Sequence, residues 1–162
     1  MSLHVEPFRA NSSNIEGLKI ISTKMATDDR GTVRELFRDS VYSEVLPETI
    51  TGWKQINLTR TRKGAVRGLH GEAMSKLVTV AYGSVFGAYV DNGFQALEDT
   101  EYLYFFDNEW APGMPGTALC PLDPELGIRW PIPVDINNSD QISQKDSKAP
   151  TFKELCEILG IN

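Results

Sequence analysis

The sequence predicts an all-β protein, a sandwich or a barrel, and two observations carry that prediction. Most of the 162 residues fall into short apolar or alternating segments, and clusters of glycine, proline, asparagine and serine separate them. Strands do not alternate with long helical segments, as they would in a βα fold. The length suits one domain with a sizeable core, so we expect a single domain over residues 1–162.

The first expected strands are the alternating segments 20–22, 33–37 and 53–58. Each is expected to bury its apolar face. Segments 77–82 and 85–90 are the most apolar, and Gly83-Ser84 between them supplies the positive φ that a two-residue turn requires. They are therefore predicted to form a central hairpin.

A dense apolar run at 102–106 predicts a further strand, and the proline- and glycine-rich segment 111–116 after it predicts a loop. The one expected helix is C-terminal. Thr151 would cap it with Glu154 three residues on, and Gly160 would end it. Its apolar stripe comprises Phe152, Leu155, Ile158 and Leu159.

Charge and composition exclude several classes of protein. A formal charge of −6 argues against binding nucleic acid through its phosphates, because that mode needs a basic surface. No run of eighteen apolar residues and no secretory signal is present, so no membrane partner and a cytoplasmic location are expected. Cys120 and Cys156 lack the spacing of a zinc site or a disulfide framework, and we expect both to be reduced.

The segment Arg67-Gly68-Leu69-His70 is the strongest indication of chemistry. A histidine can take a proton near neutral pH, and Lys76 nearby can stabilise the negative charge that forms on a carbonyl when that proton leaves. The pairing suits proton abstraction next to a ketone. His4 is the only other histidine, so no three-histidine metal site can be assembled. The alternative is a structural His70, with Arg67 part of a solvated basic strand.

Two further residues could complete such a site. Asp146 could orient His70 and stabilise its protonated form, unless it is an ordinary loop aspartate. Tyr104 could deliver a proton from the face opposite the base. Because Tyr102 and Tyr104 share one face of the strand, that face is the one expected to line a cavity, although either ring could instead be a packing residue.

Several motifs together resemble the dTDP-4-dehydrorhamnose 3,5-epimerase family, from about Leu18 to Pro150. They are Asp29-Arg30-Gly31 with Glu35, Gln55-Ile56-Asn57, Arg67-Gly68-Leu69-His70, Lys76-Leu77, Asp123-Pro124 through Ile128-Arg129-Trp130-Pro131, Ser143-Gln144-Lys145-Asp146, and Ala149-Pro150. The resemblance implies a cupin-like jelly roll, usually a dimer. It also implies activity without metal or cofactor on a nucleotide-linked 4-keto-6-deoxyhexose.

The resemblance also implies roles for individual residues. His70 corresponds to the general base, Asp146 to its partner, Tyr104 to the acid and Lys76 to the cation that stabilises the enolate. The positions that correspond to substrate-binding residues are Arg67 for the diphosphate, Arg30 and Glu35 for the nucleotide (in some members across the dimer interface), and Gln55 and Asn57 for the pocket lining.

Three departures from the family pattern affect the expected pocket. Asn92-Gly93-Phe94-Gln95 replaces the usual Ala-His-Gly-Phe turn, and Trp110 replaces a second tyrosine. Between Asp91 and Asn92 roughly thirty family residues are absent, enough for about three strands, and their loss should open the barrel. Epimerisation at C3, C5 or both, 3,4-ketoisomerisation on the same barrel, and non-catalytic binding of a nucleotide sugar therefore remain alternative functions.

Overall fold

The computed structural model describes residues 3–90 and 92–161. The chain divides after Thr51 into two compact units. The expectation of a single domain stays a prediction. Among the described residues, no helix is long and apolar enough to cross a membrane.

The N-terminal unit consists of two small antiparallel sheets and one helical turn. Strands β1 (His4–Glu6), β4 (Met25–Asp28) and β5 (Gly31–Arg34) form one sheet in the order β1-β4-β5, and β2 (Arg9–Ser12) pairs with β3 (Lys19–Ser22). Helix α1 (Asp39–Tyr42) buries Tyr42 against the rings of Phe8 and Phe37. The strand predicted at 33–37 ends at Arg34, and Ile20 and Val33 are exposed rather than buried.

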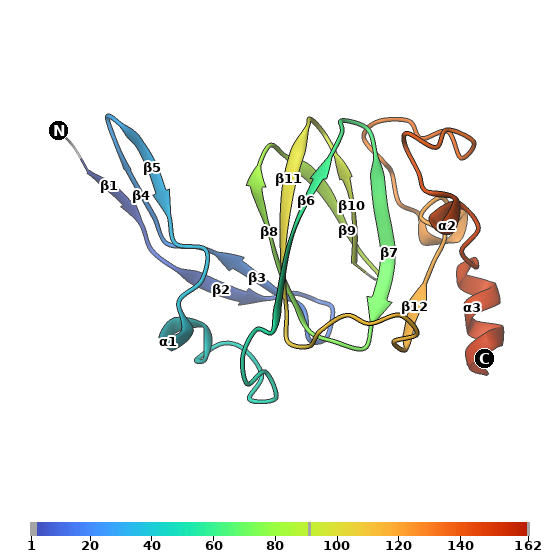
Figure 1. The fold of residues 1–162 in the computed structure, drawn as a ribbon, viewed down its shortest axis with the longest axis horizontal. Helices are drawn as coiled ribbons and strands as arrows, with labels where there is room; N and C mark the ends of the chain where they lie inside the picture. The colour runs from blue at the N-terminus through green and yellow to red at the C-terminus, as the bar shows by residue number, and fades with distance from the viewer. Residues whose placement is uncertain (1–2, 91, 162) are drawn as a thin grey trace. The chain divides into compact units, whose positions relative to one another are not determined.

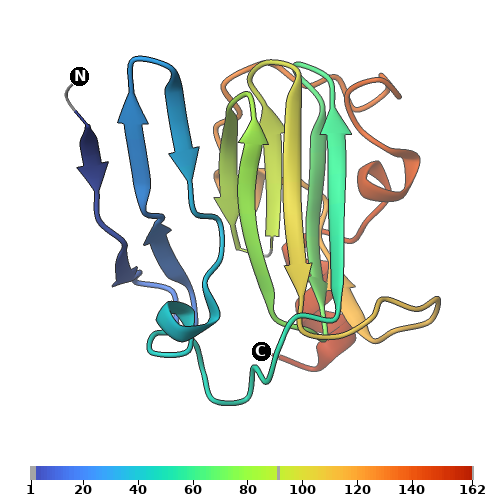
Figure 2. The ribbon, with the colours of Figure 1, turned by 60° about the vertical axis from the view of Figure 1, so that its left-hand side comes forward.

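The C-terminal unit contains two antiparallel sheets (Figure 1). A cavity lies between them. One has the order β6-β11-β8, with β6 (Gln55–Thr61), β11 (Thr100–Phe106) and β8 (Lys76–Tyr82). Figure 2 shows these three strands side by side. The other has the order β12-β7-β10-β9, with β12 (Gly116–Ala118), β7 (Val66–Glu72), β10 (Asn92–Ala96) and β9 (Val85–Tyr89). Phe94 of β10 stacks on Tyr102 of β11, with ring centroids 4.2 Å apart, and joins the two layers.

The predicted hairpin of segments 77–82 and 85–90 is wrong in its pairing. Both strands exist as β8 and β9, and Gly83 has the expected positive φ of 81°. However, β8 pairs with β11 and β9 pairs with β10, so the glycine turn carries the chain from one sheet to the other. β8 and β9 are the outermost strands of their sheets, not central ones.

The predicted burial of β6 is also reversed. Its polar residues Asn57 and Thr59 line the cavity, whereas Ile56 and Leu58 are 59% and 58% exposed on the outer face. Alternation therefore identified the strand but not the direction of its apolar face.

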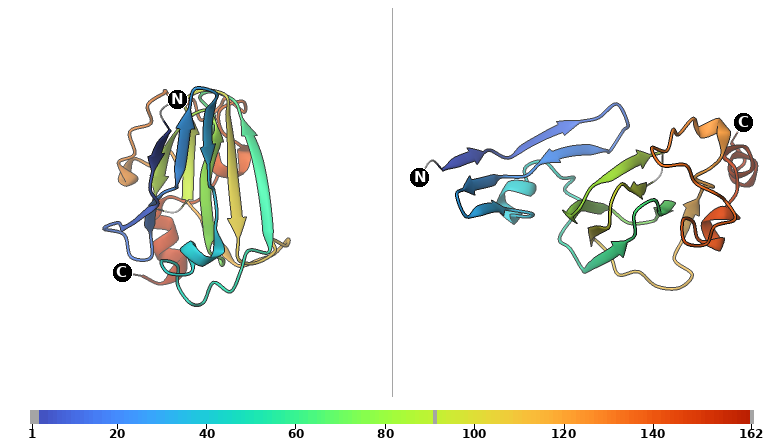
Figure 3. Two further views of the ribbon diagram at one scale, coloured as in Figure 1. Left: turned by 90° about the vertical axis from the view of Figure 1, so that its left-hand side faces the viewer. Right: turned by 90° about the horizontal axis from the view of Figure 1, so that it is seen from above.

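The C-terminal segment covers the outer face of the four-stranded sheet. Leu69, Ala88 and Leu119 form a buried cluster against which Trp130 and Leu155 pack. The predicted helix is confirmed as α3 (Phe152–Leu159), with a full Thr151–Glu154 capping box and Gly160 in the left-handed conformation. Several elements were not predicted from the sequence: strands β1, β2, β4, β7, β10 and β12, η1 (Pro124–Leu126), and the one-turn helices α1 and α2 (Gln144–Ser147). Figure 3 shows α2 and α3 at the same end of the unit.

The predicted loss of residues next to Asp91 remains untested, because Asp91 lies outside the described residues. On either side of it, Tyr89 of β9 and Asn92 of β10 face each other in the ladder.

Candidate active site

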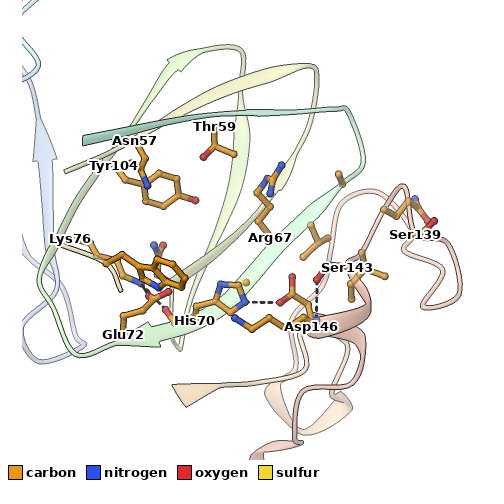
Figure 4. A pocket seen from close by; sticks show the side chains of 18 of the residues that line it. Asn57, Thr59, Arg67, His70, Glu72, Lys76, Tyr104, Ser139, Ser143 and Asp146 are labelled. Atoms are coloured by element: carbon orange, nitrogen blue, oxygen red, sulfur yellow. Dashed lines mark hydrogen bonds and ion pairs between the residues drawn. The ribbon is translucent and has the colours of Figure 1, made fainter. Parts of the chain in front are cut away.

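A cavity of about 480 Å³ lies between the two sheets of the C-terminal unit (Figure 4). Strands of both sheets contribute to it, and residues 139–143 with α2 complete the wall beside β7. The charged and polar side chains around it include Asn57, Thr59, Arg67, His70, Glu72, Lys76, Asn92, Tyr104, Ser143 and Asp146. Its size lies within the usual range for small-molecule sites.

An irregularity in β7 brings Arg67 and His70 to the same side of the sheet. Residues three apart on a regular strand point to opposite faces. In the ladder with β10, however, His70 pairs with Asn92 and Arg67 pairs with Phe94. Three residues along β7 therefore span the same length as two along β10. This β-bulge inserts one residue and reverses the alternation, and both side chains reach the cavity.

The bulge depends on glycines that face each other. Gly68 has a φ of 111°, and a Cβ there would lie 2.6 Å from Cα of Gly93 and 2.7 Å from the carbonyl oxygen of Asn92. A Cβ on Gly93 would meet Leu69 at a similar distance. Gly68 lies within β7 and allows the close approach of β10.

His70 and Asp146, far apart in the sequence, meet at the cavity wall. Nε2 of His70 lies 2.6 Å from Oδ1 of Asp146, which is 5% exposed. Asp146 lies in α2, where the Ser143 hydroxyl accepts a hydrogen bond from its backbone N–H. Burial raises the pKa of Asp146, but hydrogen bonds with His70 and Ser143 and the charges of His70 and Lys145 together lower that pKa below its ordinary value.

Lys76 reaches the cavity from β8. Its Nζ donates a hydrogen bond to the carbonyl oxygen of His70 at 2.9 Å and forms an ion pair with Glu72. Figure 4 shows Glu72 and Lys76 together near His70. Glu72 was not among the predicted site residues. The signal was present in the sequence, because Glu72 follows His70 by two residues on one strand and therefore shares its face.

Tyr104 faces the cavity from β11, as strand alternation predicted, while Tyr102 is buried against Phe94. Burial raises the pKa of Tyr104 to about 12, with Arg67 opposing the shift and Glu72 adding to it. The phenol is therefore protonated at neutral pH and can act as a hydrogen donor or an acid.

The remaining predicted contacts of the C-terminal unit are distributed around the cavity. Arg67, Asn57, Asn92 and Trp110 line it, and Oδ1 of Asn92 is buried without a hydrogen-bond partner among the described residues. Gln55 does not appear in the lining. It accepts a hydrogen bond from the backbone N–H of Trp110 and donates one to Asn57, so it holds two lining residues in place.

Arg30 and Glu35 belong to the N-terminal unit. Arg30 is paired with Asp28 at 2.6 Å, and Glu35 is paired with Arg38. Their predicted contact with a nucleotide stays a prediction. Neither cysteine is in a disulfide, as expected: Cys120 is buried and Cys156 half-buried.

Fold and cavity together define an all-β, cupin-like jelly roll with a cavity lined by ionisable side chains between its sheets. A family model described as dTDP-4-dehydrorhamnose 3,5-epimerase matches residues 12–92 and 92–154, and the chain belongs to this family.

Individual relatives agree with this assignment. The chain is 27% identical to the dTDP-4-dehydrorhamnose 3,5-epimerase of Escherichia coli (strain K12), over 90% of this chain and 95% of that protein. It is 25% identical to a dTDP-4-dehydro-6-deoxyglucose 3-epimerase of Streptomyces bikiniensis, over 91% and 90%. The crystal structure of the RmlC 3,5-epimerase from Legionella pneumophila, in complex with dTDP-4-keto-L-rhamnose, superposes with a TM-score of 0.78 at 27% identity, over 94% of this chain and 97% of that one.

Proposed function

We propose that this protein is an epimerase that inverts C3, C5 or both in a dTDP-linked 4-keto-6-deoxyhexose. The observation that carries the proposal is the meeting of a His70–Asp146 pair, Lys76 and Tyr104 at one cavity. Membership of the epimerase family supports the substrate class. No step of the proposed reaction needs a cofactor, because its acid, base and cation are side chains.

In the proposed mechanism, the Nε2–H of His70 donates to Asp146, and Nδ1 takes the proton from the carbon beside the C4 ketone. The C–H electrons form the C=C bond of an enolate, and the carbonyl π electrons move to oxygen. Lys76 donates a hydrogen bond to that oxygen. Removing one such donor typically costs about a hundredfold to a thousandfold in rate.

Tyr104 then returns a proton to the same carbon from the other side and inverts it. His70 comes from β7 and Tyr104 from β11, strands of different sheets with the cavity between them. This opposed placement favours epimerisation over 3,4-ketoisomerisation, which needs base and acid on one face of the sugar.

Proton NMR of dTDP-4-keto-6-deoxyglucose in D₂O tests this proposal. Loss of the C3 and C5 proton signals indicates a 3,5-epimerase, and loss of one indicates a mono-epimerase whose altered pocket, with Asn92 and Trp110, restricts it. Absence of exchange together with tight dTDP binding would favour a non-catalytic binding protein.

His70→Ala should abolish exchange and leave dTDP binding nearly intact, whereas equal loss of both would indicate a structural histidine.

We also propose that the protein is a homodimer. On the outer face of the β6-β11-β8 sheet, Ile56 and Leu58 are exposed, and Leu58 lies opposite the half-buried Leu103 of β11, which gives an apolar surface suited to a second sheet. In such a dimer Arg30 and Glu35 would contact the nucleotide. Light scattering should give about twice the 18.0 kDa of one chain, and Leu58→Lys should reduce that mass.

A cytoplasmic location completes the proposal. Cys120 and Cys156 are both free, which is typical of reducing compartments. Fractionation of cells that express the protein would test it.

A further inference from the structure

Among the described residues, Glu72 is the one carboxylate of the cavity, besides Asp146, that contacts another proposed catalytic side chain. It belongs to none of the family motifs in this sequence and has no part in the proposed proton transfers. A carboxylate beside a forming enolate is unfavourable by charge alone, because both are negative. Its place therefore requires a physical reason.

The contacts of Lys76 provide that reason. An ammonium group has three N–H donors. In Lys76 one donates to the carbonyl oxygen of His70 and one to Glu72, which leaves one for a ligand. The contact with the His70 backbone also ties the cation to the residue proposed as base.

The pair connects the two sheets. Glu72 ends β7 of the four-stranded sheet, and Lys76 begins β8 of the three-stranded sheet. The side chains are 25% and 14% exposed, so both are largely withdrawn from water. Because lysine has a flexible four-carbon stem, an ammonium without this partner would occupy several positions.

The charges support the same interpretation. Burial raises the pKa of Glu72, but the hydrogen bond and charge of Lys76, together with a backbone hydrogen bond and the charge of His70, lower that pKa, so the carboxylate is ionised at neutral pH. The Glu72–Lys76 pair then carries no net charge and acts as a directed donor. Arg67, by contrast, donates to the neutral oxygens of Thr61 and Arg60 and keeps its charge available for an anion.

We propose that Glu72 is a positioning residue for the epimerisation: it holds the Lys76 ammonium where the enolate oxygen forms. This inference rests on the proposed function. It predicts that Glu72 acts through Lys76 and contributes to the rate of the chemical step more than to substrate binding.

A double-mutant cycle tests the inference. Glu72→Ala should lower kcat for C3 or C5 exchange about tenfold to a hundredfold, with KM changed less than twofold, because a misplaced donor is less effective in the transition state. Glu72→Asp should recover part of the loss. In the Lys76→Ala background, Glu72→Ala should have no further effect. Even if Lys76→Ala lowers the rate a thousandfold, exchange remains measurable over hours at micromolar enzyme, so the cycle can be completed.

A second measurement is independent of turnover. In ¹⁵N-lysine-labelled protein, the Lys76 ammonium signal, assigned by its loss in Lys76→Arg, should be present in the wild type and absent in Glu72→Ala. Glu98→Ala is the matched control, since Glu98 binds Ser84 outside the cavity lining. It should leave rate and signal unchanged.

Additive losses in the cycle, or a persistent ammonium signal in Glu72→Ala, would overturn the inference. A rise in KM alone would overturn it in favour of direct substrate contact by Glu72. Absence of exchange in the wild type would refute the proposed function instead, and the ammonium signal would still decide whether Glu72 positions Lys76. Glu72→Gln, which keeps the shape of the side chain, replaces Glu72→Ala if that variant does not fold.

Discussion

Replacing Asp146 by asparagine should slow the reaction without removing the substrate site. The substitution removes the carboxylate that lies 2.6 Å from Nε2 of His70 and leaves the imidazolium without its charged partner. A hydrogen bond to a charged group contributes about 1.5–3 kcal/mol. At about 1.4 kcal/mol for each factor of ten, that corresponds to a loss of roughly tenfold to 150-fold in kcat/KM. An amide that donates to Nε2 would also favour the wrong tautomer and increase the loss.

The assay is the rate of deuterium incorporation at C3 and C5, measured together with dTDP affinity. Asp123→Asn is a matched control. Asp123 is also buried, but its carboxylate accepts backbone hydrogen bonds from Glu125 and Phe152 and lies outside the cavity lining. That variant should lose stability and keep its rate per folded molecule. An Asp146→Asn enzyme within twofold of the wild-type rate would refute the assignment of Asp146 as the partner of His70.

Three further predictions concern stability. Gly68→Ala should lower the free energy of unfolding by about 2–3 kcal/mol or more, measured by urea unfolding, because the new Cβ would overlap the backbone of β10. In Gly113→Ala the new Cβ would have no neighbouring atom within 4 Å, so the loss should be about 1 kcal/mol. Thr151→Ala should cost about 1 kcal/mol through loss of the α3 cap, seen as a lower Tm. Folding lowers the pKa of Asp146, so its ionised carboxylate stabilises the fold above about pH 4, the pKa in the unfolded chain. That stabilisation is lost as the pH falls through the pKa in the folded protein. The stability of Asp146→Asn should therefore fall less on acidification than that of the wild type.

The local elements were predictable because they depend on neighbouring residues. The capping box of α3, the positive φ of Gly83 and the strand of residues 102–106 all follow from short patterns, and each is present. Alternation likewise placed Tyr104 on the cavity face. The meeting of His70 with Asp146 followed from the family motifs rather than from spacing, since 76 residues separate them.

The pairing of strands was not predictable in the same way. A short glycine turn between two apolar strands suits a hairpin and equally suits a crossing between facing sheets, and only long-range contacts decide between them. β8 and β9 take the second course. The outward apolar face of β6 was missed because alternation does not indicate which side of a strand faces the interior.

The bulge in β7 makes the path of the backbone as important to the site as its side chains. If the same residues ran as a regular strand, Arg67 and His70 would point to opposite faces, because they are three residues apart, and one of them would turn toward the outer layer. Every catalytic side chain would still be encoded, yet the cavity would lose either the base His70 or the guanidinium of Arg67. A substitution at Gly68 that straightens the strand would therefore abolish the reaction without altering any group that takes part in it.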